Sequence, residues 1–94
     1  MELLLSHHGT SFATRERARE LVATLPGTAA QEELLIGLDG VTASPSFMAE
    51  LLTRLSSRFL SMSIEGGSEH LRGITFSLVE RLGLGGRVRD LAKH

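Results

Sequence analysis

Apolar and polar positions follow one another along this chain in blocks that predict strands and helices in turn. Two short apolar runs, at residues 3–5 and 34–38, are typical of buried strands. Residues 59–65 predict a third strand, because Leu60, Met62 and Ile64 alternate with Ser61 and Ser63. Between and after them, apolar residues recur at intervals of three and four, as on one face of a helix. The resulting β-α-β-α-β-α order predicts one small α/β domain over residues 1–94, with a mostly parallel sheet and packed helices.

Each predicted helix has an apolar stripe and its own start signal. The first helix follows an N-cap at Thr14 and stops at Pro26–Gly27, the second begins near Ser44, and the third follows Ser68. Gly83–Leu84 has the pattern of a helix C-cap, so residues 83–94 are expected to form a C-terminal cap and tail. The three stripes consist of Ala18, Leu21, Val22 and Leu25; of Met48, Leu51, Leu52 and Leu55; and of Leu71, Ile74, Leu78, Val79 and Leu82.

The strand and tail patterns carry four further expectations about the sheet. The continuous apolar run at 34–38 is typical of a central parallel strand that is covered on both faces. Gly37 within this run suggests the close approach of a helix. Val88 and Leu91 are expected to pack as a short terminal helix turn. Because three strands make a small sheet, an edge strand is expected from the N-terminus or from a second copy of the chain, which would be a homodimer.

Composition and charge exclude several classes of partner. Ten Lys and Arg residues stand against eleven Asp and Glu residues, and this balance argues against a nucleic-acid binder, which usually has a basic stripe. The absence of cysteine excludes disulfides and thiolate metal sites and is compatible with the cytosol. Met1–Leu5 is too short and too acidic for a signal peptide, and no apolar run approaches the roughly 20 residues of a membrane span. We therefore expect a cytoplasmic protein.

Histidines and glycines do not form a pattern that predicts a metal site or a cofactor site. His7 and His8 are neighbours at a strand end and point to opposite sides, while His70 and His94 lie far away in the sequence. The Gly83–Gly86 segment follows a helix, whereas a dinucleotide-binding loop must follow a strand and open a helix. Because no nucleophile–base pair stands out either, we expect no metal, no cofactor and no enzymatic activity.

Several isolated residues remain as candidates, each with a plain structural alternative. Arg15 and Arg19 share a helix face and suit a solvated, salt-bridged surface, but Arg15 also lies close to the preceding loop. Phe76 points away from the third apolar stripe and marks either an interface or an incidental exposed ring. Asp39 and Glu65 end successive strands and are expected to lie near one another at the carboxyl end of the sheet, as solvated charges.

The segment from Asp39 to Phe47 is the most informative corner of the chain, because a buried strand there passes into a helix. Either Ser44 is the N-cap with Pro45 at the first helical position, or Ser46 is the N-cap. In both cases a serine hydroxyl stands at a helix N-terminus near Thr42, where an anion would meet free N–H groups and the positive end of the helix dipole. The alternative is that these serines serve as caps alone.

Two segments resemble the STAS-like domains of unknown function. Gly9–Ala18 contains Phe-x-Thr-Arg, which is similar to the helix start of that family, and Leu38–Glu50 resembles its corner with Asp, Val and Ser-Phe-x-x-Glu. The resemblance spans roughly residues 3–82. That family is similar in turn to the anti-sigma-factor antagonists, which carry Asp-Ser-Ser-Gly at this corner, where a partner kinase phosphorylates one serine and breaks the complex. Pro45-Ser46-Phe47 stands here in place of Asp-Ser-Ser, so Ser46 alone matches by position.

The resemblance implies a STAS-like fold and a non-catalytic regulatory module that docks a protein partner. It implies a histidine-kinase-type ATP-binding protein as that partner, and Ser46 as the position where a phosphate would be placed. Pro45 and Phe47 differ from the polar neighbours of the family's serine, so docking through Thr42–Phe47 is favoured there over phosphorylation. The alternative function is a small-ligand site at the same corner, in which Arg15 and the helix N-terminus hold an anion such as a nucleotide phosphate.

Overall fold

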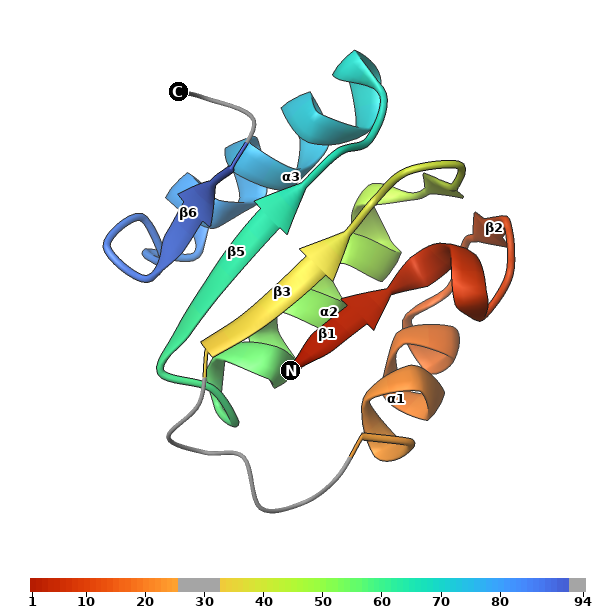
Figure 1. Cartoon of the computed structure of the whole chain (residues 1–94), viewed down its shortest axis with the longest axis horizontal. Helices are drawn as coiled ribbons and strands as arrows, with labels where there is room; N and C mark the ends of the chain where they lie inside the picture. Colours follow the sequence, from red (N-terminus) through yellow and green to blue (C-terminus); the bar gives the residue numbers. More distant parts are fainter. Residues whose placement is uncertain (26–32, 92–94) are drawn as a thin grey trace.

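The described residues of the protein form a four-stranded parallel sheet with three α-helices and a second, two-stranded parallel sheet (Figure 1). The computed structural model describes residues 1–25 and 33–91, so the predicted helix stop at Pro26–Gly27 lies outside the described residues. The main sheet has the order β1-β3-β5-β6. Its strands are β1 (Glu2–Leu4), β3 (Glu33–Gly37), β5 (Ser61–Glu65) and β6 (Val88–Asp90); the small sheet pairs β2 (Ser11–Phe12) with β4 (Thr42–Ala43), and the helices are α1 (Arg15–Ala23), α2 (Pro45–Ser56) and α3 (Glu69–Arg81).

All three helices begin at the side-chain caps that the sequence predicts. The hydroxyls of Thr14, Ser44 and Ser68 each accept a hydrogen bond at 3.1 Å from a backbone N–H three residues further on. Ser44 is therefore the N-cap of α2 with Pro45 at its first position, which decides between the two predicted registers. At the other end of α3, Gly83 has a φ of +73° and the Leu84 N–H bonds the Val79 carbonyl at 2.8 Å, as in a Schellman cap.

The prediction of a terminal helix turn at Val88 and Leu91 is wrong, because this segment forms β6. Val88 is buried while Arg89 is exposed, which is the two-residue period of a strand. The segment pairs parallel to β5: the Met62 N–H bonds the Arg87 carbonyl at 2.8 Å, and the Leu91 N–H bonds the Ile64 carbonyl at 3.0 Å. The fourth strand thus comes from the chain's own C-terminal segment.

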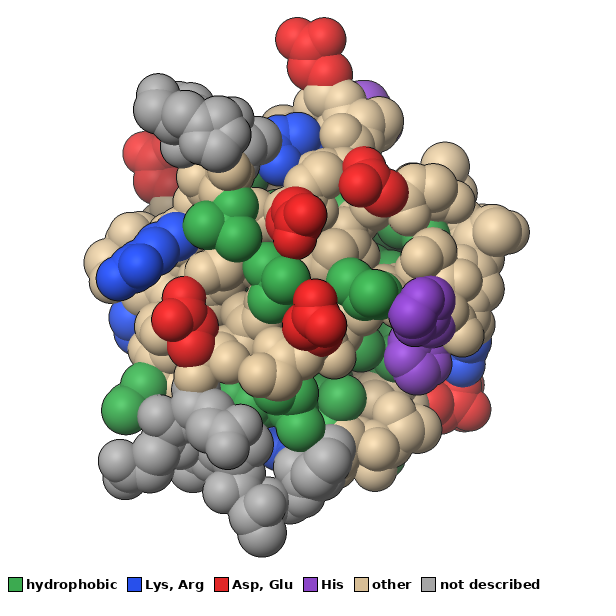
Figure 2. All heavy atoms as spheres, in the orientation of Figure 1, with side chains coloured by type: hydrophobic (Ala, Val, Ile, Leu, Met, Phe, Trp, Pro, Cys, Tyr) green, Lys and Arg blue, Asp and Glu red, His purple; other side chains and the backbone are tan. Residues whose placement is uncertain are grey.

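The helices cover one face of the main sheet and leave the other face open. α2 and α3 pass behind the strands in Figure 1, and α1 packs against α2. Side chains of the helix-covered face are buried: Leu3, Leu34, Ile36, Met62, Ile64 and Val88. The alternate positions form what we call the open face, seen in Figure 2: Glu2, Leu4, Glu33, Leu35, Gly37, Ser61, Ser63, Glu65 and Arg89. Within residues 1–25 and 33–91 no helix covers this second face of residues 34–38, contrary to the expectation, and Leu35 and Gly37 are half-buried there.

Gly37 allows the close approach of a side chain on the open face, whereas the sequence predicted the close approach of a helix. A Cβ atom built on Gly37 would stand 2.6 Å from Cδ2 of Leu4, the residue beside it on β1. The glycine therefore allows the Leu4 side chain to lie across β3. On the helix side, Thr75 is fully buried and its hydroxyl bonds the Leu71 carbonyl at 2.8 Å. Leu82, expected on the apolar stripe of α3, is 39% exposed because it is the C-cap.

Candidate functional site

The corner between β3 and α2 is held in place by the first loop of the chain. The Thr42 N–H bonds the carbonyl of Thr10, and the Ser44 N–H bonds the carbonyl of Phe12, both at 2.9 Å. These bonds pair β4 with β2 across about thirty residues of sequence. Sequence reasoning missed both strands because two residues are too few to show a period.

Ser44 and Ser46 have different surroundings at the start of α2. The Ser44 hydroxyl donates to the Ala13 carbonyl at 2.9 Å and accepts from the Phe47 N–H at 3.1 Å, so it joins the loop to the helix. Ser46 occupies the second position of α2 and is exposed. The structural task therefore belongs to Ser44, and the Ser46 hydroxyl lies at the surface beside the positive end of the helix dipole.

Phe47 belongs to the core, although the resemblance placed it in the docking corner. Its side chain has no exposed surface, and its ring lies 4.9 Å from the Phe12 ring, centroid to centroid, at a tilt of 35°. The Arg17 guanidinium lies over the other ring of the pair, 5.5 Å from the Phe12 centroid. A partner cannot touch Phe47 without unfolding the start of α2, so the prediction of Phe47 as a docking residue is wrong.

Two grooves follow one another along α3 beside the start of α2. The first, which we call the corner groove, has a volume of about 240 Å³ and is lined by Ser11, Phe12, Ala13, Thr42, Ala43, Ser44, Ser68, His70 and Leu71. The second, the helix groove, has a volume of about 270 Å³ and is lined by Pro45, Ile74, Ser77, Leu78 and Arg81. Together with exposed Ser46 they form the corner surface. Its lining combines hydroxyls, one imidazole, one guanidinium and apolar side chains.

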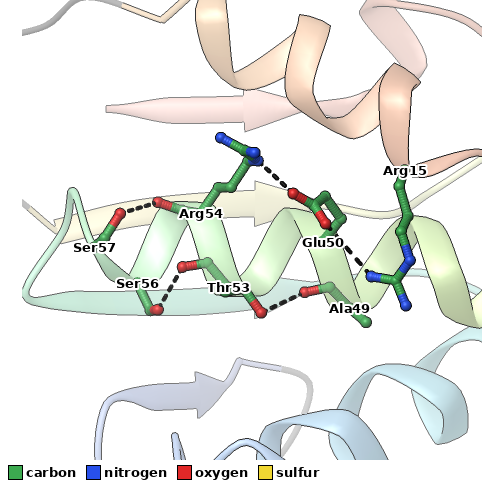
Figure 3. Close-up of polar contacts among 7 residues, drawn as sticks. All are labelled: Arg15, Ala49, Glu50, Thr53, Arg54, Ser56 and Ser57. Atoms are coloured by element: carbon green, nitrogen blue, oxygen red, sulfur yellow. Dashed lines mark hydrogen bonds and ion pairs between the residues drawn. The ribbon is translucent and has the colours of Figure 1, made fainter.

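Arg15 reaches from α1 to α2 and not to the corner groove. Its Nη1 atom lies 3.4 Å from Oε1 of Glu50, while the second carboxylate oxygen of Glu50 pairs with Arg54, one turn further along α2 (Figure 3). The hydrogen bond from Arg54 is the main cause that lowers the pKa of Glu50 below its usual value, and Arg15 adds to this shift. Arg15 thus ties α1 to α2 through a carboxylate that Arg54 also holds.

Asp39 and Glu65 lie together at the carboxyl end of the sheet, as predicted. Both line a hollow of about 300 Å³ on the open face, which is separate from the corner groove. Asp39 also has a structural contact that the sequence did not reveal: its Oδ1 atom accepts the Gly67 N–H at 2.8 Å. A Cβ atom on Gly66, where φ is +71°, would overlap the Asp39 carboxylate. The adjacent glycines were the available signal for this contact.

Phe76 is half-buried at the side of α3 that faces β6. The Arg72 guanidinium lies 5.4 Å from the centroid of its ring and also pairs with Asp90 at the end of β6. These residues line a groove of about 570 Å³ together with Glu69, Gly73, Val79, Gly85 and Val88. The ring therefore forms part of a groove wall, with one face occupied by an arginine.

Over residues 1–25 and 33–91, no three His, Asp or Glu side chains are placed to hold a metal ion together. His94, one of the histidines considered as metal ligands from the sequence, lies outside the described residues. Within the described part of the chain, no helix combines the length and the apolar character needed to cross a membrane. No family model, no curated protein and no solved structure matches the chain.

Proposed function

We propose that this chain is a non-catalytic regulatory module that docks a partner protein through the corner surface. The observation that carries the proposal is the division of roles between the two serines at the start of α2. Ser44 is engaged on both sides by backbone groups, whereas Ser46 is exposed and follows Pro45, which lines the helix groove. A contact or a charge at Ser46 therefore changes the surface without removing the bonds that hold the corner.

Ser46 is also a position where a negative charge is compatible with the fold. At the second residue of a helix of twelve residues, an anion lies beside the positive end of the helix dipole. A phosphate would add a charge of about −1.5 to −2 and alter the recognition of a partner. The sequence resemblance supports an ATP-binding protein of the histidine-kinase type as this partner.

The test uses a photo-crosslinking amino acid at Ser46, with the same substitution at Ser57 as the matched control. Ser57 is exposed and is the C-cap of α2, eleven residues after Ser46 and about 16 Å away along the helix. A protein captured from Ser46 and absent from Ser57 is then purified, and its affinity is measured for Ser46→Glu, Ser46→Ala and Ser57→Glu. We expect an ATP-binding regulator whose affinity changes with Ser46→Glu alone. Equal capture at both positions, or equal affinity for all three variants, would contradict the proposal.

A panel of nucleotides in a thermal-shift assay addresses the small-ligand alternative. A ligand at about 100 times its dissociation constant stabilises the folded state by about 2.7 kcal/mol, which is readily visible in a domain of this size. The proposal predicts no nucleotide-dependent shift for the isolated chain. A shift that is lost in Arg15→Gln would favour the small-ligand site instead.

A further inference from the structure

The open face of the main sheet is unusual because the sheet is entirely parallel. Parallel sheets occur almost always with both faces covered, since their strands carry apolar side chains on both sides. Here α1, α2 and α3 account for one face only, and the described residues place no helix over the other. The side chains of the open face are therefore available to a binding partner.

Leucine side chains give the open face apolar surface on both sides of β5, whose own residues on this face are Ser61, Ser63 and Glu65. Leu4 lies half-buried across Gly37, and Leu35 is half-buried on the neighbouring strand. Leu91 continues the alternation of β6 beyond Asp90, on the side of Arg89, and is 40% exposed. These leucines retain apolar surface that a covering element would bury.

The open face also concentrates negative charge. Glu2, Glu33 and Glu65 lie on it and are exposed, Asp39 joins them at the carboxyl end, and Arg89 is the one basic residue among the positions that define the face. Four carboxylates against one guanidinium give a local charge of −3, whereas the whole chain carries −1. Figure 2 shows acidic side chains set among hydrophobic ones on the face that lies in front of the strands in this view.

A hollow in this face has the shape and chemistry of a site for a long basic side chain. It has a volume of about 300 Å³ and is lined by Glu2, Leu4, Ser6, Gly37, Asp39 and Glu65. The Leu4 side chain, which lies across Gly37, gives the hollow an apolar wall, and Glu2, Asp39 and Glu65 add carboxylates to its lining. Lysine and arginine combine an apolar stem with a cationic head in the same way.

We propose that the open face docks a basic, amphipathic helix of a partner protein. The leucines of such a helix would cover Leu4 and Leu35, and one of its Lys or Arg side chains would enter the hollow between Glu2 and Glu65. Helices are the elements that cover the faces of parallel sheets, and charge complementarity selects a cationic one. A second copy docked face to face would set this net negative surface against itself, so the occupant is a different protein.

The experiment uses a fluorescent Leu/Lys peptide of about 15 residues, long enough to cross four strands as a helix. Its leucines repeat at helical spacing, and a scrambled peptide of the same composition has no apolar face. Binding to the full chain is followed by anisotropy and mapped by backbone amide shifts. We expect the amphipathic peptide to bind, the scrambled one to bind at least about tenfold more weakly, and the shifts to lie on β1, β3 and β5.

The matched variants separate a docking surface from simple charge attraction. Glu2→Lys with Glu65→Lys should weaken binding about fivefold to tenfold, because two exposed charge contacts become repulsive. Glu16→Lys with Glu20→Lys makes the same change of net charge on exposed positions of α1 and should alter binding less than about twofold. If the lysine pair on the sheet does not fold, Glu2→Gln with Glu65→Gln should show the same direction of change.

Three results would overturn this proposal. They are equal weakening by the two lysine pairs, equal binding of the scrambled peptide, and amide shifts that map to the corner surface. A dimer in sedimentation that Glu2→Lys with Glu65→Lys alters would identify a second copy as the occupant and would contradict it as well. Crosslinking from Ser46 tests the corner surface independently of the peptide experiment, so failure of one proposal does not imply failure of the other.

Discussion

Replacing Phe47 with alanine removes an aromatic ring from a position with no exposed surface at the start of α2. The loss combines the transfer free energy of the ring with the cavity left behind, and such substitutions cost about 3–5 kcal/mol. A chain of 94 residues is expected to have a total stability of about 5–14 kcal/mol. The substitution should therefore lower the melting temperature by at least about 12 °C and remove a large part of the stability.

The assay is urea unfolding of the full chain followed by circular dichroism, with Phe76→Ala as the matched control. Phe76 is half-buried at the side of a groove, so its removal should cost about 1–2 kcal/mol. The milder variants Phe12→Leu and Phe47→Leu, combined in a double-mutant cycle, should show a coupling of about 0.5–1.5 kcal/mol for the ring pair. A cost below about 1 kcal/mol for Phe47→Ala, or one equal to that of Phe76→Ala, would refute the core assignment and return Phe47 to the docking surface.

Three more perturbations test the contacts around the corner and the helices. Ser44→Ala should lose about 1–3 kcal/mol in urea unfolding, because it removes a cap and a bond to the loop, while Ser46→Ala should stay within about 0.5 kcal/mol; equal losses would contradict the division of roles. Gly66→Ala should lower the free energy of unfolding by at least about 1–2 kcal/mol, because alanine is strained at the positive φ of this position. Adding Asp39→Ala to this variant removes the overlap of the new Cβ with the Asp39 carboxylate, so it should recover only the part of the loss that comes from this overlap. Full recovery would show that the positive φ contributes nothing. Glu50→Gln should be less stable than the wild type near pH 7. Because the pKa of Glu50 is lowered in the folded state, this difference should shrink as the pH falls below about 4.5, and a constant difference in thermal unfolding would contradict the ion-pair account.

Much of the helical structure followed from local chemistry. The caps at Thr14, Ser44 and Ser68, the proline at the first position of α2 and the glycine after α3 each act within one turn of the chain. Local rules therefore predicted where α1 and α3 begin and where α3 ends, and they restricted the start of α2 to Ser44 or Ser46. The order of strands and helices then restricted the fold to a parallel α/β arrangement.

The C-terminal strand and the small sheet depended on partners that are distant in the sequence. Val88–Asp90 has too few residues to show a reliable period, and it becomes a strand because β5 offers an edge for it. The pairing of β2 with β4 brings Ser11 beside Thr42 in the same way. A segment of two or three residues is too short to show the alternation of apolar and polar residues that predicts a strand, so only the tertiary structure reveals this long-range pairing.

The sequence by itself determined the class of fold, the helix starts and the position of the corner, because these depend on spacing and on capping groups within a few residues. Only the tertiary structure decided which side chains the corner exposes: Phe47 turns into the core against Phe12, and Ser46 turns out. It also decided that the helices cover one face of the sheet and leave Glu2, Leu35 and Glu65 on the other. Burial is a property of three-dimensional packing, and an apolar run has the same pattern whether the chain itself or a partner covers its second face.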